Sequence, residues 1–238
     1  ATSGTLQSLG INSRAVLEAA VEQINIRGIA TGDGVIADLD LSYYDSACNV
    51  DTATSVINKI IETDAIVGMG PTCSGVAEVI YGHFQKKVDS LDDSGLQFPI
   101  LADTPMKIGL AKKSEWVFRN VANEWVMYDK LFDWVQTKYP NLKTYHSGIE
   151  IDQGHSKETW SKVIKVHADK HGYKQLGEEH WSMRDTSFSV QSRKFSQSNA
   201  DIIIISAHPP TTCGILKELA LQKITPKLLI GLTSSASP

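Results

Sequence analysis

Residues 201–205 (DIIII) constrain the fold more than any other segment. Four consecutive isoleucines leave no polar side, and an unbroken β-branched run is typical of a strand that is buried on both faces. Strands of this kind belong to parallel sheets that carry helices on both sides. The segment therefore predicts an α/β fold.

Helical and strand patterns alternate along most of the chain, which indicates the same fold class. The segment 117–123 (VFRNVAN) interrupts the alternation before a helix rich in aromatic residues. We therefore predict two α/β lobes, residues 1–121 and residues 122–238, the second incomplete, each with a parallel sheet flanked by helices. The predicted helices are 12–27, 51–63, 74–87, 123–138, 156–171 and 211–222; the predicted strands are 35–41, 65–69, 98–101, 142–148, 201–206 and 227–231; and the predicted core tryptophans are Trp125, Trp134, Trp160 and Trp181.

Charge and hydropathy exclude several classes of partner. The net charge is −4 and no block of like charges occurs, so neither nucleic acid nor an anionic membrane is an expected partner. No apolar stretch of about 18 residues is present. Residues 1–10 lack the basic-then-apolar layout of a signal peptide. A signal peptide that had already been cleaved would leave the same sequence. Three cysteines without a Cys-x-x-Cys pair argue against a zinc knuckle and leave one possible disulfide and one spare thiol.

The stretch 68–79 (GMGPTCSGVAEV) places small and polar residues where an apolar strand ends and a helix begins. Ligands collect at the carboxyl ends of strands in open α/β sheets, where the next helix offers unpaired N–H groups. Ser74 and Gly75 would hold an anionic group such as a carboxylate there. The alternative is a tight turn in which Ser74 caps the helix, worth about 1 kcal/mol. The residues alone leave both interpretations open.

The sequence contains partial matches to a phosphate-binding loop and to a zinc site, but each match lacks a required residue. Gly70 and Gly75 have phosphate-loop spacing, but Val76 and Ala77 replace the required Lys and Ser/Thr. The histidines of HADKH, His167 and His171, can hold zinc at this spacing, but the glutamate of a zinc protease is missing. A solvated helix face is the favoured interpretation. No nucleophile motif appears, so we predict no enzyme, no cofactor and no metal.

A collinear series of segments resembles the type I periplasmic solute-binding proteins, specifically the branched-chain amino acid and amide group. The resemblance runs in order through nearly the whole chain. Its implied fold has two lobes joined by a hinge, which close on a small ligand before the protein docks on the membrane permease of an ABC transporter. The segments are SGTLQSLG, AVEQIN, YYDSACNVDTATSVINKII, GPTCSGVAE, FPILADT, VFRN, IDQGHSK, DTSFSVQ and ADIIIISAHPP.

Site residues carry over from the resemblance by position. Ser74 and its neighbouring backbone would meet a ligand carboxylate. Ala102 and Thr104 would hold its polar head, and Gln153 and His208 would face it from the second lobe. The segment 5–10, which includes Leu9, would cover one side. The ligand-binding set is thus Leu9, Ser74, Gly75, Ala102, Asp103, Thr104, Gln153 and His208.

The resemblance also implies a disulfide between Cys48 and Cys73. It would stabilise the fold by about 3 kcal/mol in the chain-entropy model and belongs outside the cytoplasm. The alternative is two buried thiols. Cys213 would stay free and buried. We expect a periplasmic or otherwise extracytoplasmic monomer.

Three departures from the family pattern affect the ligand. Gln153 stands where a tyrosine is expected, and Leu9 where an aromatic residue is common. Residues 232–234 lack the acidic side chain that often binds an α-ammonium group, although Asp103 offers another carboxylate. Amino acids, amides, ureas and short carboxylates therefore stay open as ligands. Family members are longer, which predicts a truncated chain. A ligand-sensing ectodomain or an amide-sensing regulator with the same fold is the alternative function.

Overall fold

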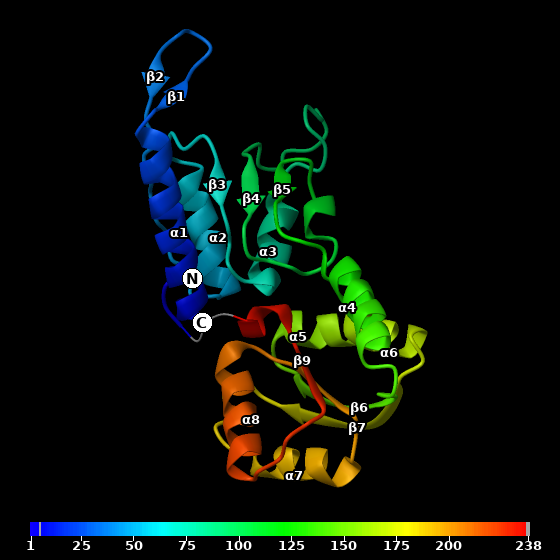
Figure 1. Ribbon diagram of the computed structural model, residues 1–238. Coiled ribbons are helices and arrows are strands. Elements are labelled where there is room, and N and C mark those ends of the chain that lie inside the picture. Colours follow the sequence, from blue (N-terminus) through cyan, green and yellow to red (C-terminus); the bar gives the residue numbers. More distant parts are fainter. Residues whose placement is uncertain (5, 237–238) are drawn as a thin grey trace. The chain divides into compact units, whose positions relative to one another are not determined.

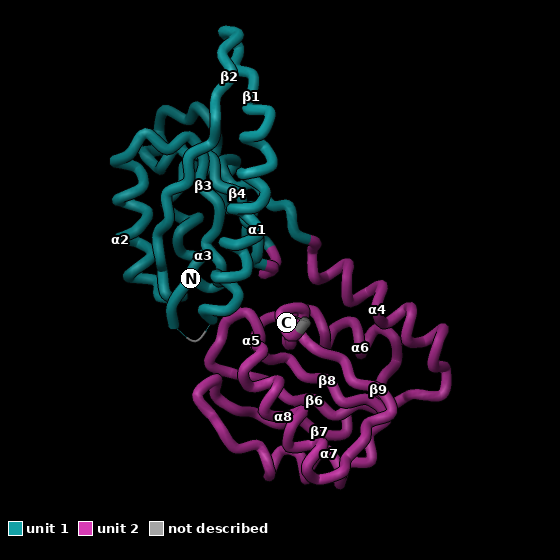
Figure 2. The backbone as a smooth tube through the Cα atoms, turned by 60° about the vertical axis from the view of Figure 1, so that its left-hand side comes forward, with its two compact units in different colours: residues 1–105, 109–121 teal, residues 106–108, 122–238 magenta. Residues whose placement is uncertain are grey.

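A computed structural model describes residues 1–4 and 6–236 (Figure 1). The chain forms two compact units, coloured separately in Figure 2. Unit 1 contains residues 1–105 and 109–121, and unit 2 contains residues 106–108 and 122–238. Among the described residues, no helix combines the length and apolar character needed to cross a bilayer.

Unit 2 is built on a four-stranded parallel sheet with the strand order β7-β6-β8-β9. The strands are β6 (Thr144–Glu150), β7 (Lys174–Trp181), β8 (Ile202–Ser206) and β9 (Leu228–Gly231). β6 and β8 pair along most of their lengths, from Tyr145 opposite Ile202 to Ile149 opposite Ser206. The prediction of parallel strands is confirmed.

Both faces of this sheet are covered, as the isoleucine run predicts. Ile202 and Ile204 pack into one hydrophobic cluster with α4 (Glu124–Lys138) and the helical segment 154–170. Ile203 and Ile205 pack into a second cluster with α7 (Ser189–Ser198) and α8 (Pro209–Leu221). Because successive side chains of a strand point to opposite faces, the run fills both cores. Figure 1 shows the two helical layers.

The predicted helix 156–171 is present with an irregular centre. It divides into α5 (Gly154–Thr159), a π-helical turn (Trp160–Ile164) and α6 (Lys165–Lys170). Sequence analysis missed β7, α7 and β5 (Val117–Arg119). The tryptophan prediction is half right, because Trp160 and Trp181 are buried, whereas Trp125 and Trp134 are 41% and 50% exposed.

Unit 1 carries a smaller parallel sheet with the order β3-β4-β5. Its strands are β3 (Gly68–Met69), β4 (Ile100–Ala102) and β5 (Val117–Arg119). Ile100 and Val117 are paired neighbours and pack with α2 (Val50–Ile60) and α3 (Ser74–Ile80) into one core. The amino-terminal helix is α1 (Gln7–Asn25).

Two strand predictions in unit 1 are wrong in part. The segment 35–41 contributes only β2 (Ile36–Ala37), which pairs antiparallel with β1 (Ile29–Ala30) rather than with the main sheet. The turn between them is closed locally by Thr31 and Asp33, so the hairpin forms without burial. The segment 65–69 is not a buried strand, because Ile66 is 78% exposed.

Candidate ligand-binding site

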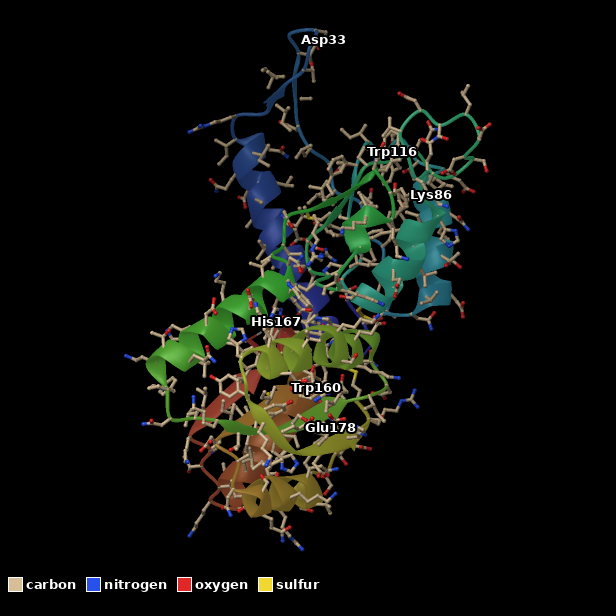
Figure 3. All side chains as sticks on the ribbon, turned by 90° about the vertical axis from the view of Figure 1, so that its right-hand side faces the viewer. Asp33, Lys86, Trp116, Trp160, His167 and Glu178 are labelled. Atoms are coloured by element: carbon tan, nitrogen blue, oxygen red, sulfur yellow. A yellow bond between two sulfur atoms is a disulfide. The ribbon has the colours of Figure 1, made fainter. Side chains whose placement is uncertain are left out.

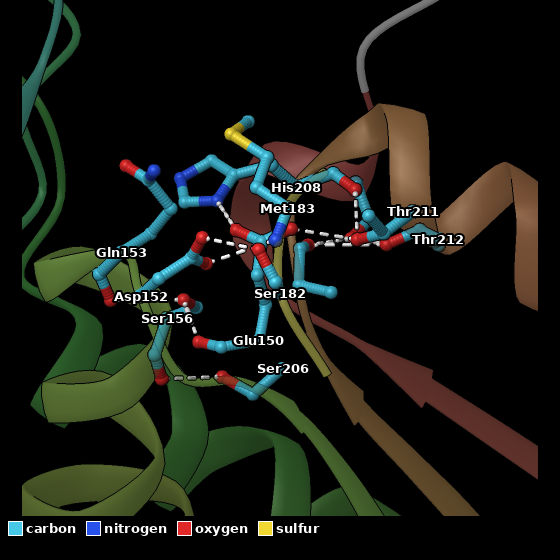
Figure 4. A network of polar contacts seen from close by, with 12 residues as sticks. Glu150, Asp152, Gln153, Ser156, Ser182, Met183, Ser206, His208, Thr211 and Thr212 are labelled. Atoms are coloured by element: carbon cyan, nitrogen blue, oxygen red, sulfur yellow. Dashed lines mark hydrogen bonds and ion pairs between the residues drawn. The ribbon is translucent and has the colours of Figure 1, made fainter. Parts of the chain in front are cut away.

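A buried glutamate ends the central strand of unit 2. Glu150 is the last residue of β6 and is fully buried. Its Oε1 lies 2.5 Å from Nδ1 of His208, and its Oε2 accepts a hydrogen bond of 2.6 Å from Oγ1 of Thr211. Figure 4 shows this network at the carboxyl ends of the strands. The two partners satisfy a carboxylate that burial would otherwise destabilise.

His208 is placed by the turn from β8 into α8. It is the extended residue before the helix, and Pro209 occupies the first helical position, which favours that geometry. Because a carboxylate accepts but does not donate, Nδ1 of His208 carries the proton that faces Glu150. Nε2 then donates when the ring is an imidazolium and accepts when the ring is neutral. The ring can therefore meet either a carboxylate or an amide.

The loop after β6 presents Gln153 on the same edge of the sheet. Asp152 ties this loop to the end of β7, because its carboxylate accepts hydrogen bonds from Oγ of Ser182 (2.6 Å) and the backbone N–H of Met183 (2.9 Å). Gln153 itself is the extended residue before α5, and its side chain does not cap the helix. In Figure 4 the Gln153 amide and the His208 ring point to the same side of the network.

A second glutamate–histidine pair, in which the glutamate is buried, lies beside the first. Oε1 of Glu124, the first residue of α4, is 3.0 Å from Nε2 of His155. The rings of His155 and His208 are 5.5 Å apart between centroids. Burial alone would raise the pKa of Glu124, but hydrogen bonds from His155, Thr233 and Thr159 outweigh it and lower this pKa below its usual value. Glu124 is therefore a carboxylate at neutral pH.

Sequence analysis missed Glu150, Glu124, His155 and Thr211. Glu150 carries the one available signal, since it is a charged residue that lies two positions after the predicted strand 142–148. Its partners follow 58 and 61 residues later in the chain, so no local pattern joins them. The histidines of HADKH are also placed differently from the prediction. His167 is fully buried and does not belong to a solvated helix face.

In unit 1, the predicted residues follow two neighbouring strands. β3 and β4 pair in parallel, with Met69 opposite Leu101, so the segments that follow them start from the same edge of the sheet. Ser74 is the first residue of α3 and is 6% exposed. The capping residue is Cys73, so the alternative in which Ser74 caps the helix is wrong. Gly75 is exposed, and a Cβ atom added there would meet open space.

The turn after β4 holds three further predicted residues. Ala102 is fully buried, and Asp103 buries its Oδ1 without a hydrogen-bond partner among the described residues. Oγ1 of Thr104 lies 3.2 Å from Oγ of Ser13 in α1. Leu9 is half-buried in the same helix. Of the predicted covering segment 5–10, residue 5 lies outside the described residues.

The disulfide between Cys48 and Cys73 is present, with the two Cα atoms 5.7 Å apart. It fixes the turn directly before Ser74 to the start of α2. The prediction for the third cysteine is wrong in one respect. Cys213 is free but exposed, because it lies on the outer side of α8, whereas Ile215 and Leu219 of the same helix face the core.

A family model described as periplasmic binding protein matches residues 1–238. The chain belongs to the periplasmic binding protein family. The predicted type I fold, an α/β fold with parallel sheets flanked by helices, is confirmed. No curated protein matches the chain.

Solved structures of periplasmic binding proteins share the fold. LivJ of Streptococcus pneumoniae, a branched-chain amino acid transporter substrate-binding protein in complex with isoleucine, is 18% identical with a TM-score of 0.76, over 97% of this chain and 61% of that one. The leucine-binding protein LivK of Thermotoga maritima is 13% identical with a TM-score of 0.79, over 100% and 62%. A solute-binding protein of an ABC transporter from Rhodopseudomonas palustris, in complex with 4-hydroxybenzoate, is 16% identical with a TM-score of 0.75, over 99% and 60%.

At such low identities these likenesses show the fold alone. This binding-protein chain spans about three fifths of the length of the structures it matches.

Proposed function

We propose that the chain is the ligand-binding part of an extracytoplasmic solute-binding protein. It binds a small polar metabolite without converting it and delivers that metabolite to the membrane permease of an ABC transporter. The observation that carries the proposal is the match of the family model over the whole chain, together with polar residues at the carboxyl edges of both parallel sheets. In this proposal, side chains of both units contribute to ligand binding.

The chemistry of unit 2 supports binding rather than catalysis. The acids at the edge of its sheet are each held by fixed partners, Glu150 by His208 and Thr211, and Glu124 by His155. Such a preorganised polar set binds a ligand at low entropic cost, because its side chains are already ordered.

The ligand class that fits best carries a carboxylate. When the His208 ring, held by Glu150, carries both protons, its Nε2 donates to a carboxylate oxygen. The Gln153 amide adds a neutral donor on the same side of the network. In unit 1, Ser74 and Thr104 would contribute hydroxyl groups. The two bound ligands named among the similar structures, isoleucine and 4-hydroxybenzoate, both carry a carboxylate. Amides and ureas are the second class.

The disulfide supports the proposed location. A bond between Cys48 and Cys73 persists in an oxidising compartment such as the periplasm and is rare in the cytosol. We propose that the protein works there as a monomer, since delivery to a permease needs one liganded copy.

A binding experiment tests the proposal. Thermal-shift screening over amino acids, amides, ureas and short carboxylates would find the ligand, because a ligand that binds only the folded state raises the melting temperature. Calorimetry should then give one-to-one binding. His208→Ala and Gln153→Ala should weaken it by about 1–3 kcal/mol each, the cost of a lost hydrogen bond to a charged group. His180→Ala is the matched control, because His180 is exposed and pairs with Glu178 on β7.

Unchanged affinity in both site variants would place the ligand elsewhere. Recovery of a chemically altered ligand would make the protein an enzyme and overturn the proposal.

A further inference from the structure

Two acidic and two histidine side chains face each other between α4 and the end of α6. Asp129 and Asp133 lie one turn apart on α4, and His167 and His171 lie one turn apart at the end of α6. Nδ1 of His167 is 3.1 Å from Oδ1 of Asp129, and Nε2 of His171 is 3.0 Å from Oδ1 of Asp133. The four side chains therefore form two neighbouring acid–histidine contacts. None of them belongs to the candidate ligand-binding site.

His167 is the most informative of the four. Its side chain is fully buried, yet neither ring nitrogen has a hydrogen-bond partner among the described residues. The contact with Asp129 is close without hydrogen-bond alignment. The Trp125 ring packs against the imidazole of His167, with 4.3 Å between the ring centroids. His167 is labelled in Figure 3. Burying a polar group without a hydrogen-bond partner costs free energy. The buried ring nitrogens of His167 are therefore candidates for binding a ligand such as a metal ion.

The second histidine, His171, has a contact at each ring nitrogen, and the one at Nε2 is with the carboxylate of Asp133. Its Nδ1 lies 2.7 Å from the backbone carbonyl oxygen of His167. Because a carbonyl oxygen only accepts, Nδ1 carries the proton. In the neutral ring, Nε2 then presents a lone pair to the carboxylate of Asp133, and two acceptors face each other. Either a second proton or a cation must lie between them.

Three of these residues meet the distance requirement for a shared ion. Asp129, His167 and His171 each offer a ligand atom, and these atoms all lie within 4.8 Å of one another. Imidazole nitrogen and carboxylate oxygen are ligands that zinc and neighbouring transition metals prefer, whereas calcium and magnesium prefer oxygen alone.

Against the prediction of no metal from the sequence, we propose that Asp129, His167 and His171 bind a divalent transition metal of the zinc class and thereby join α4 to α6. The competitor is Lys170, whose Nζ lies 2.7 Å from Oδ1 of Asp129. The ammonium group holds the ligand oxygen when no metal is bound. Metal entry releases Lys170 from Asp129.

Direct metal titration of the chelator-treated chain tests this assignment. Zn²⁺ should bind at one equivalent per chain and raise the melting temperature, and Co²⁺ should give the visible absorption bands of a nitrogen- and oxygen-ligated ion. Mg²⁺ should compete with neither. His171→Ala should weaken Zn²⁺ binding at least tenfold. Lys170→Gln should tighten it several-fold, because the competing ammonium is removed from a position that is 59% exposed. His180→Ala, the exposed control, should leave it unchanged.

The sign of the Lys170→Gln effect separates a metal site from a plain ion-pair cluster. Binding below one equivalent in the original chain, or equal affinity after His171→Ala, would overturn the assignment. Equal or weaker binding after Lys170→Gln would remove Asp129 from the ligand set and overturn it as well. Should His171→Ala fail to fold, Asp129→Asn carries the same test, since that side chain belongs to the ligand set and is 27% exposed.

Discussion

The two units use the same sheet type but cover it differently. In unit 2, both faces of the sheet are buried under helices, with one hydrophobic cluster on each face. In unit 1, the row of Ile100 and Val117 faces the core of α2 and α3. The opposite row contains Met69 and Phe118, which are 47% and 53% exposed. Among residues 1–4 and 6–236, one parallel sheet is therefore packed on two faces and the other on one.

This difference indicates where each unit gains its stability. Burial of apolar area contributes about 25 cal/mol per Å². A sheet that is buried on two faces therefore gains more stability from packing than a sheet that is buried on one face. Unit 1 has shorter strands and a single core, and its disulfide supplies part of what the second core supplies in unit 2. We expect unit 1 to open first on heating, in hydrogen-exchange measurements resolved by residue.

The largest expected effect concerns a matched pair of isoleucines. Ile204→Ala should lower the free energy of unfolding of unit 2 by about 4 kcal/mol, because it leaves a cavity under a fully buried side chain. Ile66→Ala in unit 1 should change stability by less than about 0.5 kcal/mol, since that side chain is 78% exposed. Denaturant unfolding measures both. Equal losses of unfolding free energy in the two variants would contradict the claim that unit 2 has the more extensively buried sheet.

The disulfide should matter for unit 1 alone. Replacing Cys48 and Cys73 together by serine should cost unit 1 about 3 kcal/mol, because the cross-link no longer restricts its unfolded chain. Exchange rates in unit 2 should stay the same. Cys213→Ser is the control, and a thiol count on unfolded, unreduced protein should give one free thiol. A count of three would remove both the disulfide and the argument for an oxidising compartment.

An acid-dependent effect is expected in unit 2. Lys227, the backbone N–H groups of Lys143 and Thr144, and the Thr144 hydroxyl hold the pKa of Asp201 well below its usual value. A lowered carboxyl pKa stabilises the fold above the unfolded pKa near 4, and this contribution is lost as the pH falls toward the folded pKa. Solvent reaches Lys227, so Asp201→Asn should cost only about 1 kcal/mol at pH 7.

The measurement for Asp201→Asn is its stability relative to the original chain between pH 7 and pH 2. The difference should shrink steadily below about pH 4. A difference that stays constant over this range would mean that the carboxylate charge does not contribute.

The smallest stability effect is expected at the uncovered face of unit 1. Phe118→Ser should change the free energy of unfolding by about 0.5 kcal/mol or less, but it should reduce the binding of a hydrophobic dye such as ANS to the folded protein. Fluorescence titration measures this, with Phe132→Leu in the core of unit 2 as the control. Dye binding that does not respond would show that this face is already covered.

The contrast between the units also explains what the sequence could predict. Burial on both faces leaves a strong pattern, so the strand at Ile202–Ser206 and the helix at Glu124–Lys138 were predicted within a few residues. β7 was missed because its side chains alternate between exposed and half-buried positions, which gives a weak apolar signal. The segment 35–41 alternates like a half-buried strand, and Leu39 is half-buried against Asn25 of α1, yet only Ile36–Ala37 forms a strand. Alternation predicts extended backbone, not a sheet partner.

The site residues that follow strand ends came from the family resemblance and stay a prediction, whereas residues that depend on distant partners were missed. His208 was carried over from the resemblance of the segment 200–210 to the family, and it follows the strand β8. Glu150 was missed because a charged residue is normally exposed, and its burial depends on His208 and Thr211, far along the chain.

Calorimetric titration of the screened ligand into the original chain and into His208→Ala and Ser74→Ala tests the central claim most directly, because the two variants alter one unit each. The account predicts one-to-one binding, recovery of the ligand unchanged, and a loss of affinity of about tenfold or more in each variant. Full affinity in either variant would contradict the claim that both units hold the ligand.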